Sequence, residues 1–253
     1  MTTELLIHVI LGILLLLIPA GALYWLDRQQ LKTFGVAVGR MLVQLALLCV
    51  LMWALTQLNS PWLTLLWYFC VTVYAAFLVL KRCKLEVRRL LLPVSGGMLL
   101  GVFLVGLWVL GIGLHVRVFD PLWFVPVMAL LMGHTTTMMI RGMNTYLTSL
   151  KADEEQYEFL RGNGVTHFKA LIPFLRRSLL AVISPTVANL TVLGLTSMPL
   201  LLVGLFVGGF TPLYAFVVML MMVVGCISAS VLSLALSIVL YELSQRYIQF
   251  PGA

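Results

Sequence analysis

The chain has 253 residues, of which 62% are hydrophobic and only 10% are charged, and its formal net charge is +7. A water-soluble domain of this length cannot enclose so much apolar surface, so the composition indicates an integral membrane protein. The apolar runs are continuous and do not alternate with period two, which argues against a transmembrane β-barrel and predicts an all-α fold.

The hydropathy pattern predicts the membrane spans. A helix needs about 20 apolar residues to cross a bilayer, so the length allows roughly seven spans. The first span contains Ala20-Gly21-Ala22, which looks like a signal-peptide cleavage site, but the positive charges follow the apolar run rather than precede it. We therefore expect a retained anchor within a single membrane domain, residues 1–253. The predicted spans are 5–26, 36–58, 61–80, 90–114, 121–140, 179–207 and 213–241.

The positive charges predict the orientation of the chain. With the N-terminus outside, the cytoplasmic pieces contain all of the 16 Lys and Arg residues except Arg117. The positive-inside rule therefore predicts an N-out, C-in protein. Topology and attraction to anionic lipid of the inner leaflet explain the net charge, so no nucleic-acid partner is expected. The cytoplasmic pieces are 27–40, 81–89, 141–178 and 241–253.

The sequence contains no motif for independent chemistry. Its four cysteines form no CxxC pair and no metal-ligand spacing. It has no Walker phosphate loop, Rossmann glycine pattern, HExxH or GxSxG motif. We therefore expect that the chain is not an enzyme and binds no cofactor, and that a partner supplies any energy it uses.

Two polar residues mark the inner end of the second predicted span. Arg40 and Gln44 lie one helical turn apart. They could line the inner mouth of a pathway. Alternatively, Arg40 extends to lipid phosphates and Gln44 hydrogen-bonds to a neighbouring helix.

The fifth predicted span carries His134 among several methionines, including Met138 one turn later. Imidazole and thioether groups together can contact a soft cation. Methionine is also an adaptable filler of apolar cores, and a lone intramembrane histidine more often satisfies a hydrogen bond. Packing is therefore the preferred interpretation, and no metal site is assigned. The other histidines, including His167, suggest no shared site.

The sixth predicted span is unusually polar for a lipid-facing helix. Proline and polar residues are tolerated in a membrane helix where it faces protein or a water-filled cavity, so we expect this span to form a pathway wall. For any single residue, hydrogen bonding to a neighbouring helix is the alternative. The residues concerned are Pro185, Thr186, Asn189, Thr191, Thr196, Ser197 and Pro199.

The seventh predicted span carries small residues along much of its length. Small side chains let helix backbones approach each other closely. We expect this helix to pack against a neighbouring helix or against a second copy of the chain. The small residues are Gly225, Ser228, Ala229, Ser230, Ser233 and Ser237.

The longest predicted cytoplasmic piece, 141–178, carries both signs of charge. Good helix formers in its first half predict that the fifth helix continues beyond the membrane. Glycine and asparagine at 162–164 predict its end, because both accept a left-handed backbone. Thr166 is then a predicted N-cap for a short amphipathic helix with Phe168 on its apolar face. Such a segment could dock into a partner's groove; lying in the headgroup layer or merely connecting two spans are the alternatives.

Three stretches resemble known membrane transporters. EFLRGNG, from Glu158 to Gly164, resembles the coupling region of ABC-transporter permeases, where an acidic residue precedes a glycine that leads into a helix seated on the ATPase subunit. VGRMLVQL at 38–45 and SPTVANLTVLGLTSMPLLLVGLFVGGFTP at 184–212 are similar to the Fet-type (FetB-like) metal-export permeases of bacteria and to their plant relatives implicated in aluminium tolerance. The similarity extends over about 38–241.

The resemblance implies a permease of the bacterial inner membrane that forms a homodimer and pairs with two copies of a cytosolic ATPase subunit, which binds ATP and magnesium. The family's intramembrane acidic residue and lysine are replaced by Ala188 and Thr191, so the resemblance carries the architecture rather than the cargo. The expected function is ATP-driven export of a small solute, with a metal ion as one option. The alternative is a non-transporting scaffold or regulator that recruits a cytosolic partner. The residues expected to couple to the ATPase are Glu158, Gly164, Thr166 and Phe168.

Overall fold

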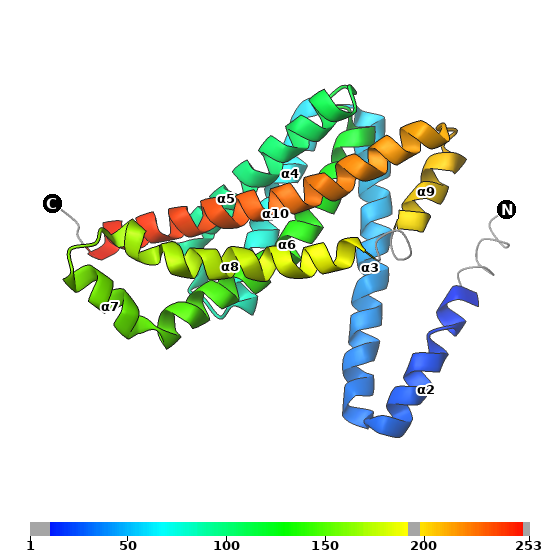
Figure 1. Cartoon of the computed structure of the whole chain (residues 1–253). Helices are drawn as coiled ribbons and strands as arrows, with labels where there is room; N and C mark the ends of the chain where they lie inside the picture. The colour runs from blue at the N-terminus through cyan, green and yellow to red at the C-terminus, as the bar shows by residue number, and fades with distance from the viewer. Residues whose placement is uncertain (1–10, 192–197, 250–253) are drawn as a thin grey trace. The chain divides into compact units, whose positions relative to one another are not determined.

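The computed structural model of the chain describes residues 11–191 and 198–249, and every regular element in these ranges is helical (Figure 1). The described part contains six helices that are long and apolar enough to cross a membrane, together with the shorter apolar helix Leu11–Leu26. The chain is therefore a polytopic all-α membrane protein, as predicted. Its backbone forms two compact units, Met1–Gln57 and Leu58–Ala253.

The first unit contains α2 (Leu17–Leu26) and α3 (Arg28–Leu58), which meet at Asp27. The N–H of Asp27 donates to the carbonyl oxygen of Leu23, and its carboxylate accepts a hydrogen bond from the N–H of Gln29 at 2.8 Å. One residue thus ends α2 and begins α3. Because of this cap, the second predicted span begins at Arg28 instead of at 36, and most of the expected inner loop at 27–40 is helical.

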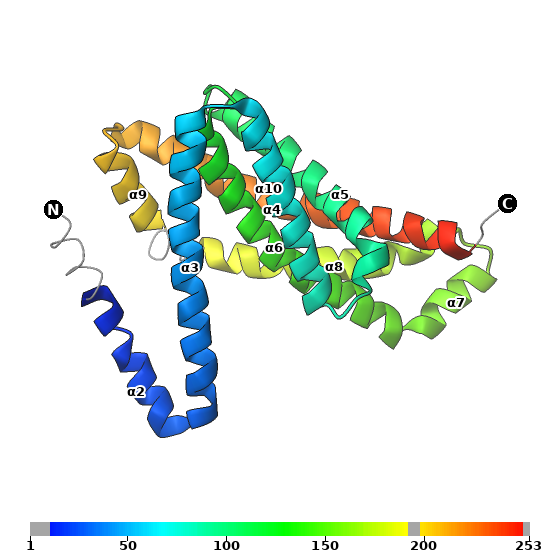
Figure 2. The same cartoon turned by 180° about the vertical axis from the view of Figure 1, so that it is seen from behind.

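The second unit is a bundle of long helices (Figures 1 and 2). Large apolar side chains from each of the five main helices fill its core, among them Val79, Met98, Met128, Phe174 and Leu234. The five are α4 (Pro61–Arg82), α5 (Val87–Leu107), α6 (Pro121–Ala152), α8 (His167–Leu190) and α10 (Pro212–Gln249). A π-helical turn, η1 (Trp108–Gly113), directly follows Leu107, the last residue of α5.

The backbones of α10 and α5 pack closely against each other. A Cβ atom added at Gly97 would lie 2.5 Å from the backbone nitrogen of Ser237, and one at Gly101 would lie 2.7 Å from that of Ser233. The hydroxyl of Ser237 also donates to the carbonyl oxygen of Val94 at 3.3 Å. The small residues of α10 therefore pack against a neighbouring helix of the same chain, which is one of the two predicted options.

In the described ranges, the sixth predicted span, 179–207, covers the end of one helix and the whole of another. Helix α8 begins earlier, at His167, and ends at Leu190, while α9 (Met198–Val207) follows the undescribed residues 192–197. The short amphipathic helix expected before this span is the first part of α8. The helix continues through Pro173 because residues on both sides of the proline, such as Ala170 and Phe174, bury one apolar face in the bundle.

Candidate coupling site

The segment 141–178 contains the end of α6, the whole of α7 (Glu154–Gly162) and the beginning of α8. Helix α6 continues beyond the predicted span, to Ala152, but it ends ten residues before the predicted stop at 162–164, because Asp153 separates it from α7. Both overall views show the C-terminal end of α10 beside the turn between α7 and α8 (Figures 1 and 2). Residues far apart in the sequence therefore meet at this turn.

The turn between α7 and α8 is closed by backbone hydrogen bonds around Gly164. This glycine has a left-handed backbone with φ of 80°. The N–H of Val165 donates to Leu160 and that of Gly164 donates to Arg161, both at 3.1 Å, in the pattern of a Schellman motif. A helix therefore ends at the predicted glycine, although this helix is α7 and not the fifth helix, as was predicted. Thr166 is the N-cap residue of α8 with an extended backbone, as predicted, although its side chain makes no capping hydrogen bond.

The predicted coupling residues lie at this turn and are accessible. Glu158, Gly164 and Thr166 are exposed, and the side chain of Phe168 is 39% exposed. Phe159, next to Glu158, is 69% exposed. The structure therefore brings the predicted residues together around one rigid turn that also presents two large aromatic side chains.

A buried polar cluster lies beside the same turn. The hydroxyl of Tyr146 on α6 donates to Oε1 of Glu242 on α10 at 2.7 Å. Nε2 of His167 lies 3.2 Å from Oε2 of that carboxylate, and Nδ1 of His167 lies 2.8 Å from the hydroxyl of Tyr157 on α7. Tyr146 is fully buried and Glu242 is only 7% exposed. These four residues, here called the Glu242 cluster, connect α6, α7, α8 and α10.

The hydrogen bonds of the Glu242 cluster form one consistent chain of donors and acceptors. Glu242 accepts from Tyr146 at one oxygen and, in the tautomer of His167 with its proton on Nε2, from His167 at the other. In the same tautomer, Nδ1 of His167 accepts from the hydroxyl of Tyr157. A buried carboxylate is costly unless it is hydrogen-bonded, so these partners stabilise Glu242 in its buried position.

Two further contacts hold the beginning of α8 against the end of α6. Arg177 forms an ion pair with Asp153, the residue that separates α6 from α7. The hydroxyl of Ser178 donates to the carbonyl oxygen of Gly142 at 2.7 Å in a buried position. A Cβ atom at Gly142 would lie 2.5 Å from a methyl group of Leu234, so a larger residue there would have to displace that side chain. These contacts hold α8 against α6 and against Asp153, the residue that precedes α7.

Comparison with known proteins places the chain in a family. The model of the uncharacterised protein family UPF0014 matches residues 6–247. The chain belongs to the UPF0014 family. The match includes the α7–α8 turn and the whole Glu242 cluster.

Two plant proteins are similar to this UPF0014 protein over most of their length. Protein ALUMINUM SENSITIVE 3 of Arabidopsis thaliana is 27% identical over 201 residues, which cover 77% of the chain and 71% of that protein. The UPF0014 membrane protein STAR2 of Oryza sativa subsp. japonica is 28% identical over 202 residues, covering 79% of the chain and 70% of that protein. No solved structure matches the chain.

The predicted pathway residues of this UPF0014 protein fall in several places. The first unit contains two of them, both exposed on α3: Arg40 and Gln44. The end of α8 and the start of α9 carry three more, also exposed: Asn189, Thr191 and Pro199. Two others lie outside the described residues: Thr196 and Ser197. Their role in a pathway stays a prediction.

His134 and Met138 lie on α6 within the second unit. His134 is half-buried, and its Nε2 has no hydrogen-bond partner in the part of the chain that the structure describes. Met138 is buried, and its sulfur lies 3.9 Å from the hydroxyl oxygen of Thr186 on α8. Across the described ranges, no group of three or more His, Cys, Asp or Glu side chains could hold a metal ion. Met138 therefore packs between helices, which agrees with the preferred interpretation of this methionine.

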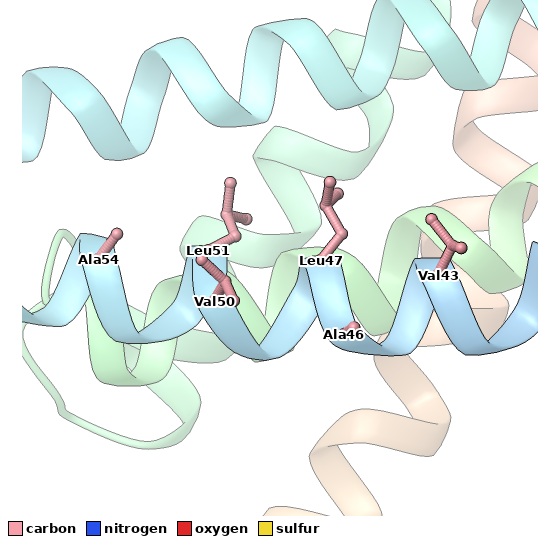
Figure 3. Close-up of a pocket in the computed structure, with 6 residues that line it drawn as sticks. All are labelled: Val43, Ala46, Leu47, Val50, Leu51 and Ala54. Carbon is pink, nitrogen blue, oxygen red and sulfur yellow. The ribbon is translucent and has the colours of Figure 1, made fainter.

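Two hollows among the described residues of this UPF0014 protein are apolar. One is a shallow hollow along a single face of α3, shown in Figure 3 and lined by Val43, Ala46, Leu47, Val50, Leu51 and Ala54. Another, of about 350 Å³, lies within the second unit and is lined by residues of α6, α9 and α10 and by Phe210. Neither hollow is lined by a charged side chain, so neither can bind an ion by charge.

The sequence reasoning missed the Glu242 cluster. His167 was interpreted as unconnected to any shared site, and this is wrong, because it contacts both Tyr157 and Glu242. One signal was present: Glu242 is the only acidic residue after Glu158, and it follows a long apolar span. An ionisable residue at such a place usually has a specific partner.

Proposed function

We propose that this UPF0014 protein is the membrane-spanning permease subunit of an ABC transporter, energised by a separate cytosolic ATPase subunit. The ATPase docks on the α7–α8 turn, where Phe159 and Phe168 enter its surface and Glu158 lies at the rim. The observation that supports this most is the exposed aromatic pair, 69% and 39% accessible, on either side of a turn that is closed by backbone hydrogen bonds.

An aromatic pair of this kind fits a docking surface better than a simple connection. Large apolar side chains exposed in a charged segment cost free energy unless a partner covers them. Helices that insert apolar anchors into a groove are a common mode of protein recognition. A segment that only joined two spans would need neither the exposed Phe159 nor a turn fixed by Gly164.

The remaining parts of the proposal concern assembly and cargo. The permease works as a homodimer in the bacterial inner membrane, with its N-terminus outside and its C-terminus in the cytoplasm. ATP binding brings the ATPase subunits together, and the turns move with them. The cargo is a small solute for export; a metal ion would pass His134, whose Nε2 has no partner among the described residues.

One observation favours a second candidate function. The stretch 178–207 contains no Asp, Glu, Lys or Arg, so the sixth predicted span offers no charged group to a metal ion. A non-transporting scaffold or regulator would use the same turn to recruit its cytosolic partner. Reconstitution of the chain and its ATPase partner in membranes separates the two functions, because only a transporter would show ATP hydrolysis that is stimulated by its cargo. Divalent metal ions are the first cargo to test.

Co-purification tests the docking surface. The chain is expressed with each ABC ATPase subunit of its own organism in turn, and ATPase recovery is measured for the unmodified chain and for Phe159→Ala/Phe168→Ala. Loss of two apolar anchors should lower the recovery about tenfold or more. Phe119→Ala, which alters a 41% exposed phenylalanine outside this segment, is the control and should bind normally. Failure of the unmodified chain to bind any ATPase, or unchanged binding of the double variant, would contradict the proposal.

A further inference from the structure

Helix α10 connects the α7–α8 turn with the apolar cavity at the other end of the second unit. Near its C-terminal end, Glu242 accepts hydrogen bonds within the Glu242 cluster. Toward its N-terminal end, Val218 and Met222 line the cavity of about 350 Å³. Val218 and Glu242 lie about 36 Å apart along the helix at 1.5 Å per residue. The same element is therefore in contact with both regions.

The helix is built to act as one body over this distance. It runs without interruption from Pro212 to Gln249. At Ser233 and Ser237 its backbone packs directly against the glycines of α5, so α10 cannot bend there without moving α5 as well. A displacement at the C-terminal end is therefore expected to reach the cavity as a movement of the α5–α10 pair.

The carboxylate of Glu242 is shared between the turn and the bundle. One oxygen binds His167, which begins α8 at the turn, and the other binds Tyr146 of α6. Separating His167 from Glu242 would leave a buried carboxylate oxygen without that partner, which is unfavourable. When the turn moves, Glu242 should therefore follow His167 and shift α10 relative to α6. The cavity is lined by residues of both α6 and α10, so its shape depends on the position of α10 relative to α6.

We propose that Glu242 is a positioning residue that transmits movement of the α7–α8 turn to α10 and, through α10, to the apolar cavity. The proposal rests on the proposed function, because an ATPase must move the turn. It assigns the transmission to α10 and not to α8, the helix that begins at the turn. Helix α8 contributes no residue to the lining of the cavity, whereas α10 does.

The experiment follows the outer end of α10 while ATP acts at the turn. Leu213, the second residue of α10, is 76% exposed and is replaced by cysteine in a chain whose four cysteines are changed to alanine. The complex with the ATPase subunit is reconstituted, and the rate of maleimide labelling at this position is compared with and without ATP. The test variant is Tyr146→Phe/Glu242→Leu, which removes both partners of the buried Tyr146–Glu242 hydrogen bond. Of the remaining cluster, only Nε2 of the partly exposed His167 loses its partner.

We expect the variant to keep ATPase binding and to lose the ATP-dependent change in labelling. The variant should bind the ATPase as the unmodified chain does, while the ATP-dependent change in labelling falls about fivefold or more. A merely structural role would lower thermal stability and ATPase binding together. Leu243→Ala, which alters the exposed neighbour of Glu242, is the control and should behave as the unmodified chain.

A second variant covers the case in which the double variant does not fold. His167→Gln leaves the Tyr146–Glu242 hydrogen bond in place and alters only the link to the turn, and it should reduce the ATP-dependent change in the same way. A normal ATP-dependent change in a variant that binds the ATPase would overturn the inference and leave the proposed function intact. Absence of ATPase binding by the unmodified chain would overturn both.

Discussion

Nε2 of His167 lies 3.2 Å from Oε2 of Glu242, although 75 residues separate the two in the sequence. This contact joins the first residue of α8 to the C-terminal part of α10. With Tyr146 and Tyr157 it forms a continuous set of hydrogen bonds through four helices. The exposed turn that presents Phe159 and Phe168 is therefore anchored to the bundle by a buried carboxylate.

Removing the Tyr146 hydroxyl should destabilise the protein. Tyr146→Phe deletes a donor to the buried carboxylate of Glu242, and a hydrogen bond to a charged group contributes about 1.5–3 kcal/mol. The free energy of unfolding in detergent measures the loss. Tyr74→Phe makes the same chemical change at a 56% exposed position and should have little effect. Equal stability of the two variants would show that the buried hydrogen bond does not stabilise the fold.

Replacing Gly164 should destabilise the α7–α8 turn through the backbone alone. Gly164 has φ of 80°, and a Cβ atom there would meet no other atom within 4 Å. Gly164→Ala should therefore cost roughly 1–2 kcal/mol of left-handed strain without any steric collision. Amide hydrogen exchange over 160–170 should increase.

Gly162→Ala provides a matched control for this turn. Gly162 is the last residue of α7, and a Cβ atom there also meets nothing within 4 Å. Because alanine favours a helix over glycine by about 1 kcal/mol, this variant should be neutral or slightly more stable. The explanation fails if both variants lose stability equally.

The membrane fold and the turn were predictable because their signals are local. Long apolar runs indicate spans whatever their neighbours are, and α3, α4, α5, α6 and α10 all lie where hydropathy predicts a helix. The turn was predictable from Asn163 and Gly164, because a left-handed residue leaves few choices of amino acid. Thr166 then followed as the residue before the next helix.

The start of α8 and the Glu242 cluster were not predictable in the same way. A hydropathy window cannot show that the amphipathic residues after His167 continue into the next span, because the burial of Ala170 and Phe174 depends on the other helices. Likewise, no periodicity within one span relates Tyr146 to Glu242. Such contacts depend on how the helices pack, so only the isolated acidic residue hinted at a partner.

The close contact of α5 with α10 should tolerate no added side chain at Gly97. A Cβ atom there would lie 2.5 Å from the backbone nitrogen of Ser237, which cannot move aside as a flexible side chain could. Gly97→Ala should therefore cost about 1–3 kcal/mol or more, as overpacking does. Gly133→Ala on α6, where a Cβ atom meets nothing within 4 Å, is the control. Thermal unfolding that is equal for both variants would contradict this packing.

The thiol of Cys83 should react slowly and only at high pH. Cys83 lies between the membrane-spanning helices α4 and α5 and is 9% exposed, with its sulfur 3.7 Å from the carbonyl oxygen of Ile140. Burial raises the pKa of this thiol from the ordinary 9.0 to about 11. The thiolate is the reactive form, so the rate of alkylation should still rise between pH 9 and 10, where an ordinary thiol is approaching full ionisation.

The measurement uses iodoacetamide on a chain in which Cys49, Cys70 and Cys226 are alanine. Lys84→Cys combined with Cys83→Ala moves the thiol by one residue to an exposed position and provides the control. The rate for the control should level off once the pH is above the ordinary thiol pKa of 9.0, while the rate for Cys83 continues to rise. If both rates level off at the same pH, Cys83 is not buried against Ile140, and the end of α4 does not pack on α6 as described.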